Sequence, residues 1–452
     1  MVSRWTKWTR RAALAVVALV LLVGSWRLAL AELISSRIAE IREKGYPVTL
    51  VELNRWYPHV APLDNGAPLL DEAFSCYSQK PAQTGEPRDD PFPDASRLGP
   101  APDPRSQTIA CSPDSNNDDA LALLQQASNA ARWRFPIDLR TLSILPYPHL
   151  GNLIRAAHLL EADAANHAAH AEAQPAIASV QSLFGLSHSL DKEPLVRSHL
   201  ARLECQRIAL NSLQNLLNGT GLTEKQLDTL ADALGRAEDQ RGLARAFIGQ
   251  RCIGIYSFEM LERMMDPVTL PAARSYPFGK RFLVNLDVLV SSPGCLGNLF
   301  GLLQCDELEY LRLMDRCVRA AQMDFPERID ATQALRESLD RQNEFHTFSM
   351  GWMRGMNGPR VILKDAALAA RLREARLAVA VERYRLAHNE LPHSLRELGS
   401  ARTDAVPADP FNGRPLQYTR LANGYVIRSV CQNIANKDDG TGLREAAFMV
   451  ER

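Results

Sequence analysis

Several features that often reveal a protein's function are missing from this sequence. Its 52 lysines and arginines are balanced by 52 aspartates and glutamates, so no basic surplus attracts nucleic acid. The sequence has no C-x-x-C pair and no H-E-x-x-H motif, which argues against the common zinc and thioredoxin-like sites. No glycine-rich phosphate loop follows a predicted strand. We therefore predict no catalytic residues, no organic cofactor and no nucleic-acid partner.

One long hydrophobic run is present, and it lies close to the N-terminus. No charged residue interrupts the segment Ala12–Trp26, and four basic residues precede it: Arg4, Lys7, Arg10 and Arg11. Continued to Ala31, the segment forms a helix about 30 Å long, which matches the hydrocarbon core of a bilayer. Because positive charges stay in the cytoplasm, we predict a single-pass inner-membrane protein with the bulk of the chain in the periplasm.

The fate of this segment after export has two alternatives. Ala29-Leu30-Ala31 resembles the small-residue motif of a cleavable signal peptide, with cleavage after Ala31. However, an apolar stripe at helical spacing continues through the motif, formed by Leu30, Ile34, Ile38 and Ile41. The stripe favours an uncleaved signal anchor, and both alternatives export the rest of the chain.

Export into an oxidising compartment changes how the eight cysteines are interpreted. An even number permits disulfide bonds, although connectivity cannot be deduced from sequence. Cys295 and Cys305 flank a short segment and form one candidate pair, and Cys76 and Cys111 bracket a proline-rich segment and form another. Burial as reduced thiols within helices fits Cys205, Cys252 and Cys317 equally well.

The remaining chain is predicted to be mainly α-helical, divided into five regions. Residues 1–31 form the cytoplasmic tail and transmembrane anchor, 32–75 juxtamembrane helices, 76–118 a linker rich in proline and aspartate, 119–364 a helical domain, and 365–452 an α+β module. Capping-box spacing marks helix starts at Thr49 and Thr223, and Lys44-Gly45 marks a helix end. Short turns between helices of similar length predict an α-helical hairpin bundle or an irregular solenoid.

The C-terminal module is predicted to contain a helix and a β-hairpin. Strands at Pro415–Leu421 and Tyr425–Cys431 are joined by Asn423-Gly424, a strong signal for a two-residue turn. This turn places Tyr418 opposite Ser429 and Arg420 opposite Ile427. Alternation then puts four apolar side chains on one face, where they can cover the preceding helix: Leu416, Tyr418, Tyr425 and Ile427.

Two stretches of this module carry a family resemblance. AVERYRLAHNELPHSLREL and VPADPFNGRPLQYTRLANGYVIRSVCQNIANKDDG, within residues 375–440, resemble the globular part of type II secretion major pseudopilins. Those proteins share a D-P-[FW]-x-[GN]-x-P turn followed by a Y-x-[IV]-x-S strand. The prepilin peptidase signal is missing from this chain, so the resemblance implies a shared folding unit rather than filament assembly. The whole chain also resembles membrane-anchored envelope proteins of Gram-negative bacteria, through GYPVTLVELNRWYP and SLDKEPLVRSHLARLECQRIAL.

The pseudopilin resemblance implies a calcium-binding loop near the end of the chain. The matching positions are Asp438 and Asp439, with oxygens of Asn433 and Asn436 as further ligands. Calcium takes six to eight oxygen ligands, so backbone carbonyls would complete the site. The alternative interpretation of this loop is a solvated polar turn.

One further cluster could bind a metal ion. Asp163, His167 and His170 share a helix face at i, i+4 and i+7, close to His158 and Glu161. An ordinary polar stripe on a helix explains the same pattern. Ser187 lies in a G-L-S-H-S sequence that lacks the closing glycine of a nucleophile elbow.

We therefore predict a non-catalytic protein of the cell envelope. Its helical surface would bind other envelope proteins or act as an assembly scaffold, while the N-terminal helix holds it in the membrane. One alternative is an exported metal-dependent hydrolase built around residues 158–172. Another is an accessory protein of a secretion system, acting through the pseudopilin-like module.

Overall fold

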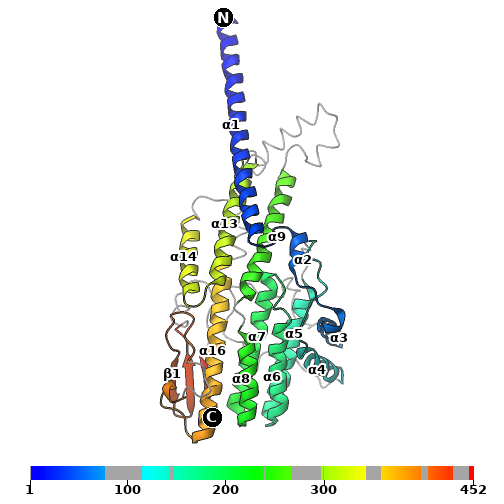
Figure 1. Ribbon diagram of the computed structural model, residues 1–452, viewed down its shortest axis with the longest axis vertical. Helices are drawn as coiled ribbons and strands as arrows, with labels where there is room; N and C mark the ends of the chain where they lie inside the picture. The colour runs from blue at the N-terminus through cyan, green and yellow to red at the C-terminus, as the bar shows by residue number, and fades with distance from the viewer. Residues whose placement is uncertain are drawn as a thin grey trace, which may run out of the picture.

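The computed structural model describes residues 2–76, 115–141, 147–238, 241–265, 297–298, 300–342, 358–398, 406–430 and 447–451. Long helices run side by side to form an elongated body (Figure 1). A small antiparallel sheet lies at the end of the body opposite to the protruding α1. The predicted mainly α architecture with a small β element is therefore confirmed, while most of the predicted linker lies outside the described residues.

The N-terminal part follows its local sequence signals. Helix α1 (Val2–Glu43) ends at Lys44-Gly45, where Gly45 adopts φ 76°, as its position after a helix C-terminus requires. Helix α2 (Leu50–Trp56) starts with the predicted capping box between Thr49 and Glu52. The turn η1 (Pro62–Asp64) and helix α3 (Ala67–Cys76) follow. The boundary predicted at residue 31 falls within the continuous helix α1.

The first layer of the body consists of helices that are close in sequence. Helices α5 (Pro148–Ala169), α6 (Ala173–His188) and α7 (Val196–Gly219) pack against one another. Helix α4 (Ser115–Ser128) packs on α3 and α6, and α8 (Glu224–Ala237) begins with the predicted capping box at Thr223. Their apolar stripes form one hydrophobic core that includes Leu153, Val180, Leu213 and Leu230.

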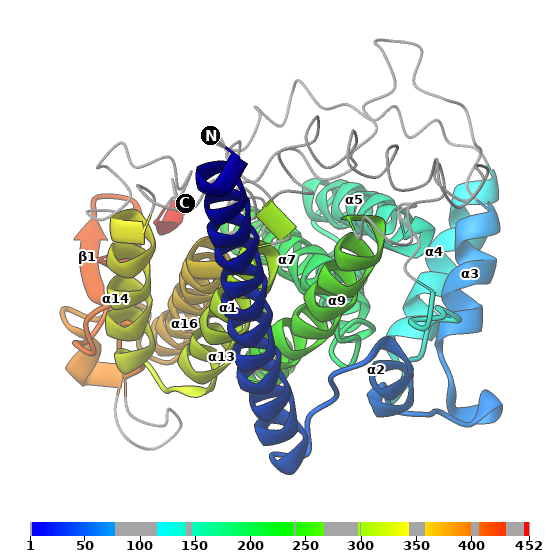
Figure 2. The same ribbon diagram turned by 90° about the horizontal axis from the view of Figure 1, so that it is seen from above.

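A second group of helices completes the body. It contains α9 (Gly242–Met265), α13 (Leu302–Gln322), α14 (Glu327–Gln342) and α16 (Gly358–His388). Viewed along the long axis, α1 lies over this group, with α3 and α4 at one side and α14 and β1 at the other (Figure 2). Helix α16 packs on α7, α8, α13 and α14, and it crosses the boundary predicted at residue 365 without a break. Since a solenoid stacks only sequence neighbours, these contacts describe a bundle.

The sheet has three strands in the order β1 (Gln417–Leu421), β2 (Gly424–Arg428) and β3 (Phe448–Glu451), all antiparallel. The short turn predicted before the hairpin is present as η2 (Leu395–Leu398). Strand β3 was not expected from the sequence. Its Phe448 and Val450 are buried against the first core, together with Tyr425 and Ile427 of β2. The hydroxyl of Tyr425 donates to the Ala378 carbonyl of α16 at 3.1 Å, which ties the sheet to the bundle.

The predicted hairpin register is wrong by two residues. Tyr418 lies opposite Ile427, Arg420 lies opposite Tyr425, and the turn is formed by Ala422-Asn423. Gly424 lies within β2, where the neighbouring strand β3 comes close to it. A Cβ atom at this position would lie 1.9 Å from the Val450 carbonyl oxygen. A slip of two residues keeps each side chain on its face, so the predicted apolar face is confirmed.

Candidate functional site

Helix α1 has an exposed half and a half that packs against the body along one stripe. Helix α1 is long and apolar enough to cross a membrane, a property that a signal sequence would share, and its most apolar part lies in the exposed half. Its leucines and valines from Leu14 to Leu22 have exposed fractions between 53% and 68%. The second half packs on α13 through the predicted stripe, in which Leu30 is 3% exposed and Ile34 and Ile41 are also buried.

The buried stripe is part of the second hydrophobic core. Ile34 and Ile41 cluster with Phe247 of α9 and Met314 of α13. Gly301, in the left-handed conformation directly before α13, comes close to α1: a Cβ atom there would lie 3.1 Å from Leu30. Each buried leucine or isoleucine contributes about 1.5–3 kcal/mol. The docked half of α1 is therefore an integral part of the bundle.

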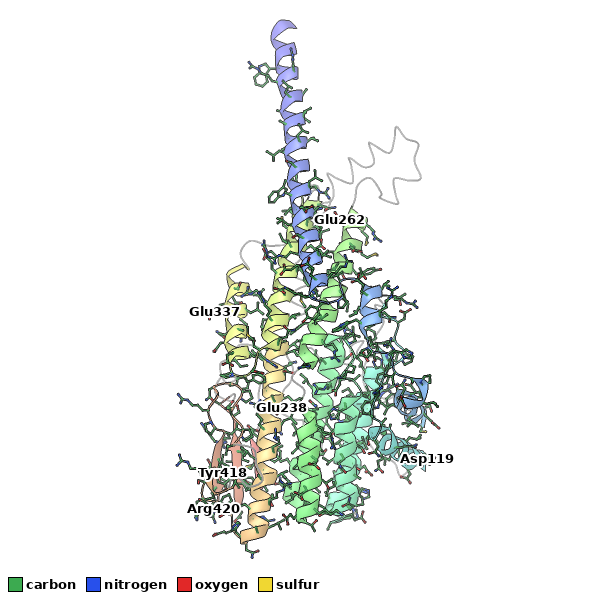
Figure 3. The ribbon with its side chains drawn as sticks, viewed as in Figure 1. Asp119, Glu238, Glu262, Glu337, Tyr418 and Arg420 are labelled. Carbon is green, nitrogen blue, oxygen red and sulfur yellow. The ribbon has the colours of Figure 1, made fainter. Side chains whose placement is uncertain are left out.

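Polar groups meet where α1 leaves the body. Arg27 donates to Glu262 of α9 and to Gln304 of α13, each at 3.3 Å. Gln304 also donates to Glu262 at 3.2 Å, which closes a triangle between three helices. Figure 3 shows Glu262 at the base of the protruding helix. Arg27 is the first charged residue after the apolar run. Glu262 balances its charge at the point where the exposed half of α1 ends.

A carboxyl group lies close to this triangle on α13. Burial and the nearby carboxylates of Glu262 and Glu259 raise the pKa of Glu307 to about 7. Glu307 therefore changes its protonation state near neutral pH, beside the point where α1 joins the body. Neither the apolar stripe nor any motif in the sequence predicted this property.

Apolar side chains surround the same point. Phe300, Leu302 and Met264, at the ends of α13 and α9 next to α1, have exposed fractions between 47% and 64%. We call Arg27, Glu262, Met264, Phe300, Leu302 and Gln304 the collar. Exposed apolar groups around a closed polar cluster suit the membrane–water interface, where both kinds of group are solvated.

The exposed apolar segment alone is short for a bilayer. The segment Ala12–Trp26 measures about 22 Å at ~1.5 Å per residue, whereas the hydrocarbon core is about 30 Å thick. The predicted span reached Ala31, but Leu30 is buried against the helical body. A membrane-spanning role for this segment would require insertion of the collar into the interface or local thinning of the bilayer.

A buried ionic cluster, which was not predicted, connects α7, α14 and α16. Asp365 lies 3.0 Å from His199 Nε2 and accepts a hydrogen bond from Arg328 at 2.9 Å, with all three side chains buried. Burial alone would raise the pKa of Asp365, but the hydrogen bond from His199 and the charges of His199 and Arg328 hold it below its usual value. The sequence showed His199 only as one member of a helical stripe.

The predicted histidine cluster forms in part. His167 lies between two carboxylates, with Nδ1 2.6 Å from Glu172 and Nε2 3.4 Å from Asp163. Asp163 also accepts a hydrogen bond from the Ser179 hydroxyl. His170 instead contacts the carbonyl of Asn166 on its own helix, at 2.8 Å. Among the residues that the structure describes, no group of three side chains is placed to hold a metal ion.

The other predicted site residues have different positions. Ser187 is buried within α6, where its hydroxyl donates to the Phe184 carbonyl. Cys76 and Cys305 are partly exposed on α3 and α13, and Cys205, Cys252 and Cys317 are buried thiols. Cys111, Cys295 and the loop with Asp438 and Asp439 lie outside the described residues, so the two disulfides and the calcium site stay predictions.

Comparisons with known proteins add no relative. No protein-family model, no curated protein and no solved structure matches this chain.

Proposed function

We propose that this chain is a single-pass scaffold protein of the bacterial envelope. Helix α1 anchors it in the inner membrane, and the helical body in the periplasm binds other envelope proteins. The observation that supports this proposal most is the division of α1: its first half is apolar and exposed, and its second half is built into the core. A helix with these two halves links the bilayer to the body without a flexible joint.

Retention of the anchor is supported by the buried Leu30. Cleavage after Ala31 would remove Leu30 and Arg27, and would leave Glu262 and Gln304 without their partner on α1. We expect the protein purified from membranes to have the mass of the uncleaved chain. A mass that begins at residue 32 would reject the anchor and leave an exported soluble protein.

The orientation follows from the basic residues before the apolar run. We expect a reporter enzyme that is active only in the cytosol to be inactive when fused to the C-terminus. As a control, removing the charges of Arg4, Lys7, Arg10 and Arg11 together should weaken this preference. Activity of the wild-type fusion in the cytosol would overturn the assignment to the periplasm.

Insertion of the collar can be tested separately from the anchor. A polarity-sensitive fluorophore attached at Leu302 should report an apolar environment in lipid nanodiscs, compared with the same label at the exposed Leu63 of η1. A water-like signal at both positions would show that the collar stays outside the interface.

A second candidate, a secretion-system accessory protein, is favoured by the position of the sheet. The module that resembles pseudopilins lies at the end of the body farthest from the anchor, where Figure 3 places Tyr418 and Arg420. There β1 is an edge strand of the described sheet and exposes Thr419, so a partner strand could add to it. A photo-crosslinker at Thr419 should capture a secretion-system component in intact cells, whereas one at Lys225 should not.

A further inference from the structure

A polar cavity lies between α4, α6 and α8, away from the collar. Its volume is about 230 Å³, and these three helices belong to the half of the body far from the free end of α1 (Figure 1). Gly185 of α6 determines how closely α4 can approach at this cavity. A Cβ atom at position 185 would lie 2.6 Å from Ser128 Cβ and 2.8 Å from the Ser128 carbonyl oxygen. The missing side chain thus lets α4 approach α6 and places Ser128 at the wall of the cavity.

Polar side chains form much of the lining of this cavity. The hydroxyls of Ser128 and Ser182 lie 3.3 Å apart across the gap between α4 and α6. Side-chain amides of Gln125, Asn129 and Gln181 also line the cavity. Among the described residues, none of the lining side chains is a carboxylate. The cavity therefore offers hydroxyl and amide groups, but no negative charge.

Its cationic group comes from α8. Arg236 lines the cavity from the last turn of α8, and it forms no ion pair with a residue that the structure describes. Glu238, the residue two positions after Arg236, instead binds Arg373 of α16 at 2.7 Å. An arginine beside a polar cavity with no carboxylate is available to bind an oxyanion.

A histidine on the same cavity is held in a fixed orientation. His188 Nδ1 lies 3.0 Å from Asp191, whose other oxygen lies 2.7 Å from Nε of the buried Arg202. Burial alone would raise the pKa of Asp191, but the hydrogen bond from His188 and the charge of Arg202 keep it below its usual value. The ionised Asp191 therefore accepts a hydrogen bond from Nδ1–H, which fixes the orientation of the His188 ring at the wall of the cavity.

We propose that this cavity binds a small organic anion, with a carboxylate or phosphate held by Arg236 and hydroxyl or amide groups held by the polar lining. The volume is below that of typical drug-sized sites, so the ligand has few non-hydrogen atoms. This inference goes beyond the scaffold function and does not rest on it. An anion-binding cavity would give the body a way to respond to a small molecule.

The test is calorimetric titration of the full chain in detergent micelles. Citrate serves as the carboxylate probe, glycerol 3-phosphate as the phosphate probe and glycerol as the neutral probe. We expect at least one of the two anions to bind with a Kd below about 10 mM, and glycerol to bind at least tenfold more weakly. If neither anion binds, or if glycerol binds equally well, the proposal is overturned. The anion that binds identifies the charged group of the ligand as a carboxylate or a phosphate.

Two matched pairs of variants locate the site. Arg236→Gln should weaken binding at least about tenfold, whereas Lys225→Gln, which removes a cation from the opposite end of α8, should not. Gln125→Glu should weaken binding by repulsion, whereas Gln126→Glu, on the exposed side of α4, should not. All four positions are exposed or half-buried, so the variants keep the fold. Equal effects within either pair would reject this cavity as the site.

Discussion

The carboxylate of Asp409 accepts a hydrogen bond from the Ser429 hydroxyl at 2.9 Å, and thereby joins the turn before the sheet to the end of β2. The same carboxylate accepts from the backbone N–H groups of Phe411 and Val430. Glu374 of α16 binds the N–H of Ser429 at 2.8 Å, so the turn, the sheet and the helix meet at one serine. These contacts give a physical reason for the aspartate of D-P-F and the serine of Y-V-I-R-S to occur together.

Asp409→Ala should destabilise the C-terminal module by about 2–4 kcal/mol, because it removes the carboxylate that accepts from the buried N–H of Phe411, the half-buried N–H of Val430 and the Ser429 hydroxyl. Faster hydrogen exchange across residues 424–430 would show this loss. Asn412→Ala serves as the control: it removes one exposed hydrogen bond to the N–H of Arg414 and should change exchange little. Equal protection in both variants would mean that Asp409 does not hold the module together.

The cluster of Arg328, Asp365 and His199 allows a second prediction. Arg328→Met should cost about 3–5 kcal/mol, since it leaves the Asp365 carboxylate buried without its guanidinium partner, next to His199. The double variant Arg328→Met, Asp365→Leu should recover part of this loss, because the buried carboxylate that lost its guanidinium partner is removed as well. Thermal unfolding in detergent measures both. A double variant that is less stable than Arg328→Met would contradict the assigned pairing.

The same cluster determines the response to acid. The folded-state pKa of Asp365 is lowered, so its contribution is present above the unfolded pKa of about 4 and is lost as pH falls through the folded value. We expect Asp365→Asn to be less stable than the wild type at pH 7, and the difference to shrink below about pH 4. The difference in unfolding temperature between pH 3 and pH 7 tests this sign, and a gap that widens in acid would contradict it.

Glu307 gives the opposite pH dependence. Its pKa is raised from 4.5 to about 7, so the folded chain binds a proton that the unfolded chain has released between these values. Stability falls as pH rises through this interval, by an amount on the order of 3 kcal/mol. Glu307→Gln should therefore raise the unfolding temperature at pH 8 and change it little at pH 4. Glu309→Gln, which breaks a surface pair with Arg312, should show no such trend.

Features determined by short segments could be predicted from the sequence. The end of α1 at Gly45 and the capping boxes at Thr49 and Thr223 need only neighbouring residues, and all three are confirmed. The apolar stripe of α1 was also predicted, although its partner α13 was not. A periodic pattern shows that a helix face is buried, but it does not identify the surface that covers the face.

Features that join distant segments could not be predicted. His199 and Asp365 are 166 positions apart, and Arg27 and Glu262 are 235 apart. Each of these residues by itself looks like an ordinary polar side chain on a helix. The cavity was missed for the same reason, because α4, α6 and α8 each supply only a few polar residues that solvent exposure would explain equally well.

The role of Gly424 provides the last prediction, because it distinguishes the observed register from the one expected from the sequence. In an Asn423-Gly424 turn, both positions would need positive φ, and replacing either residue would be costly. In the structure, Gly424 has φ 156° within β2 and also makes room for the Val450 carbonyl of β3, while Asn423 lies in the loop. Gly424→Ala should therefore separate β3 from β2 and speed hydrogen exchange at residues 448–451, whereas Asn423→Ala should leave β3 protected. If Asn423→Ala exposes β3 as strongly as Gly424→Ala, the turn lies at Asn423-Gly424 and the register returns to the one with Tyr418 opposite Ser429.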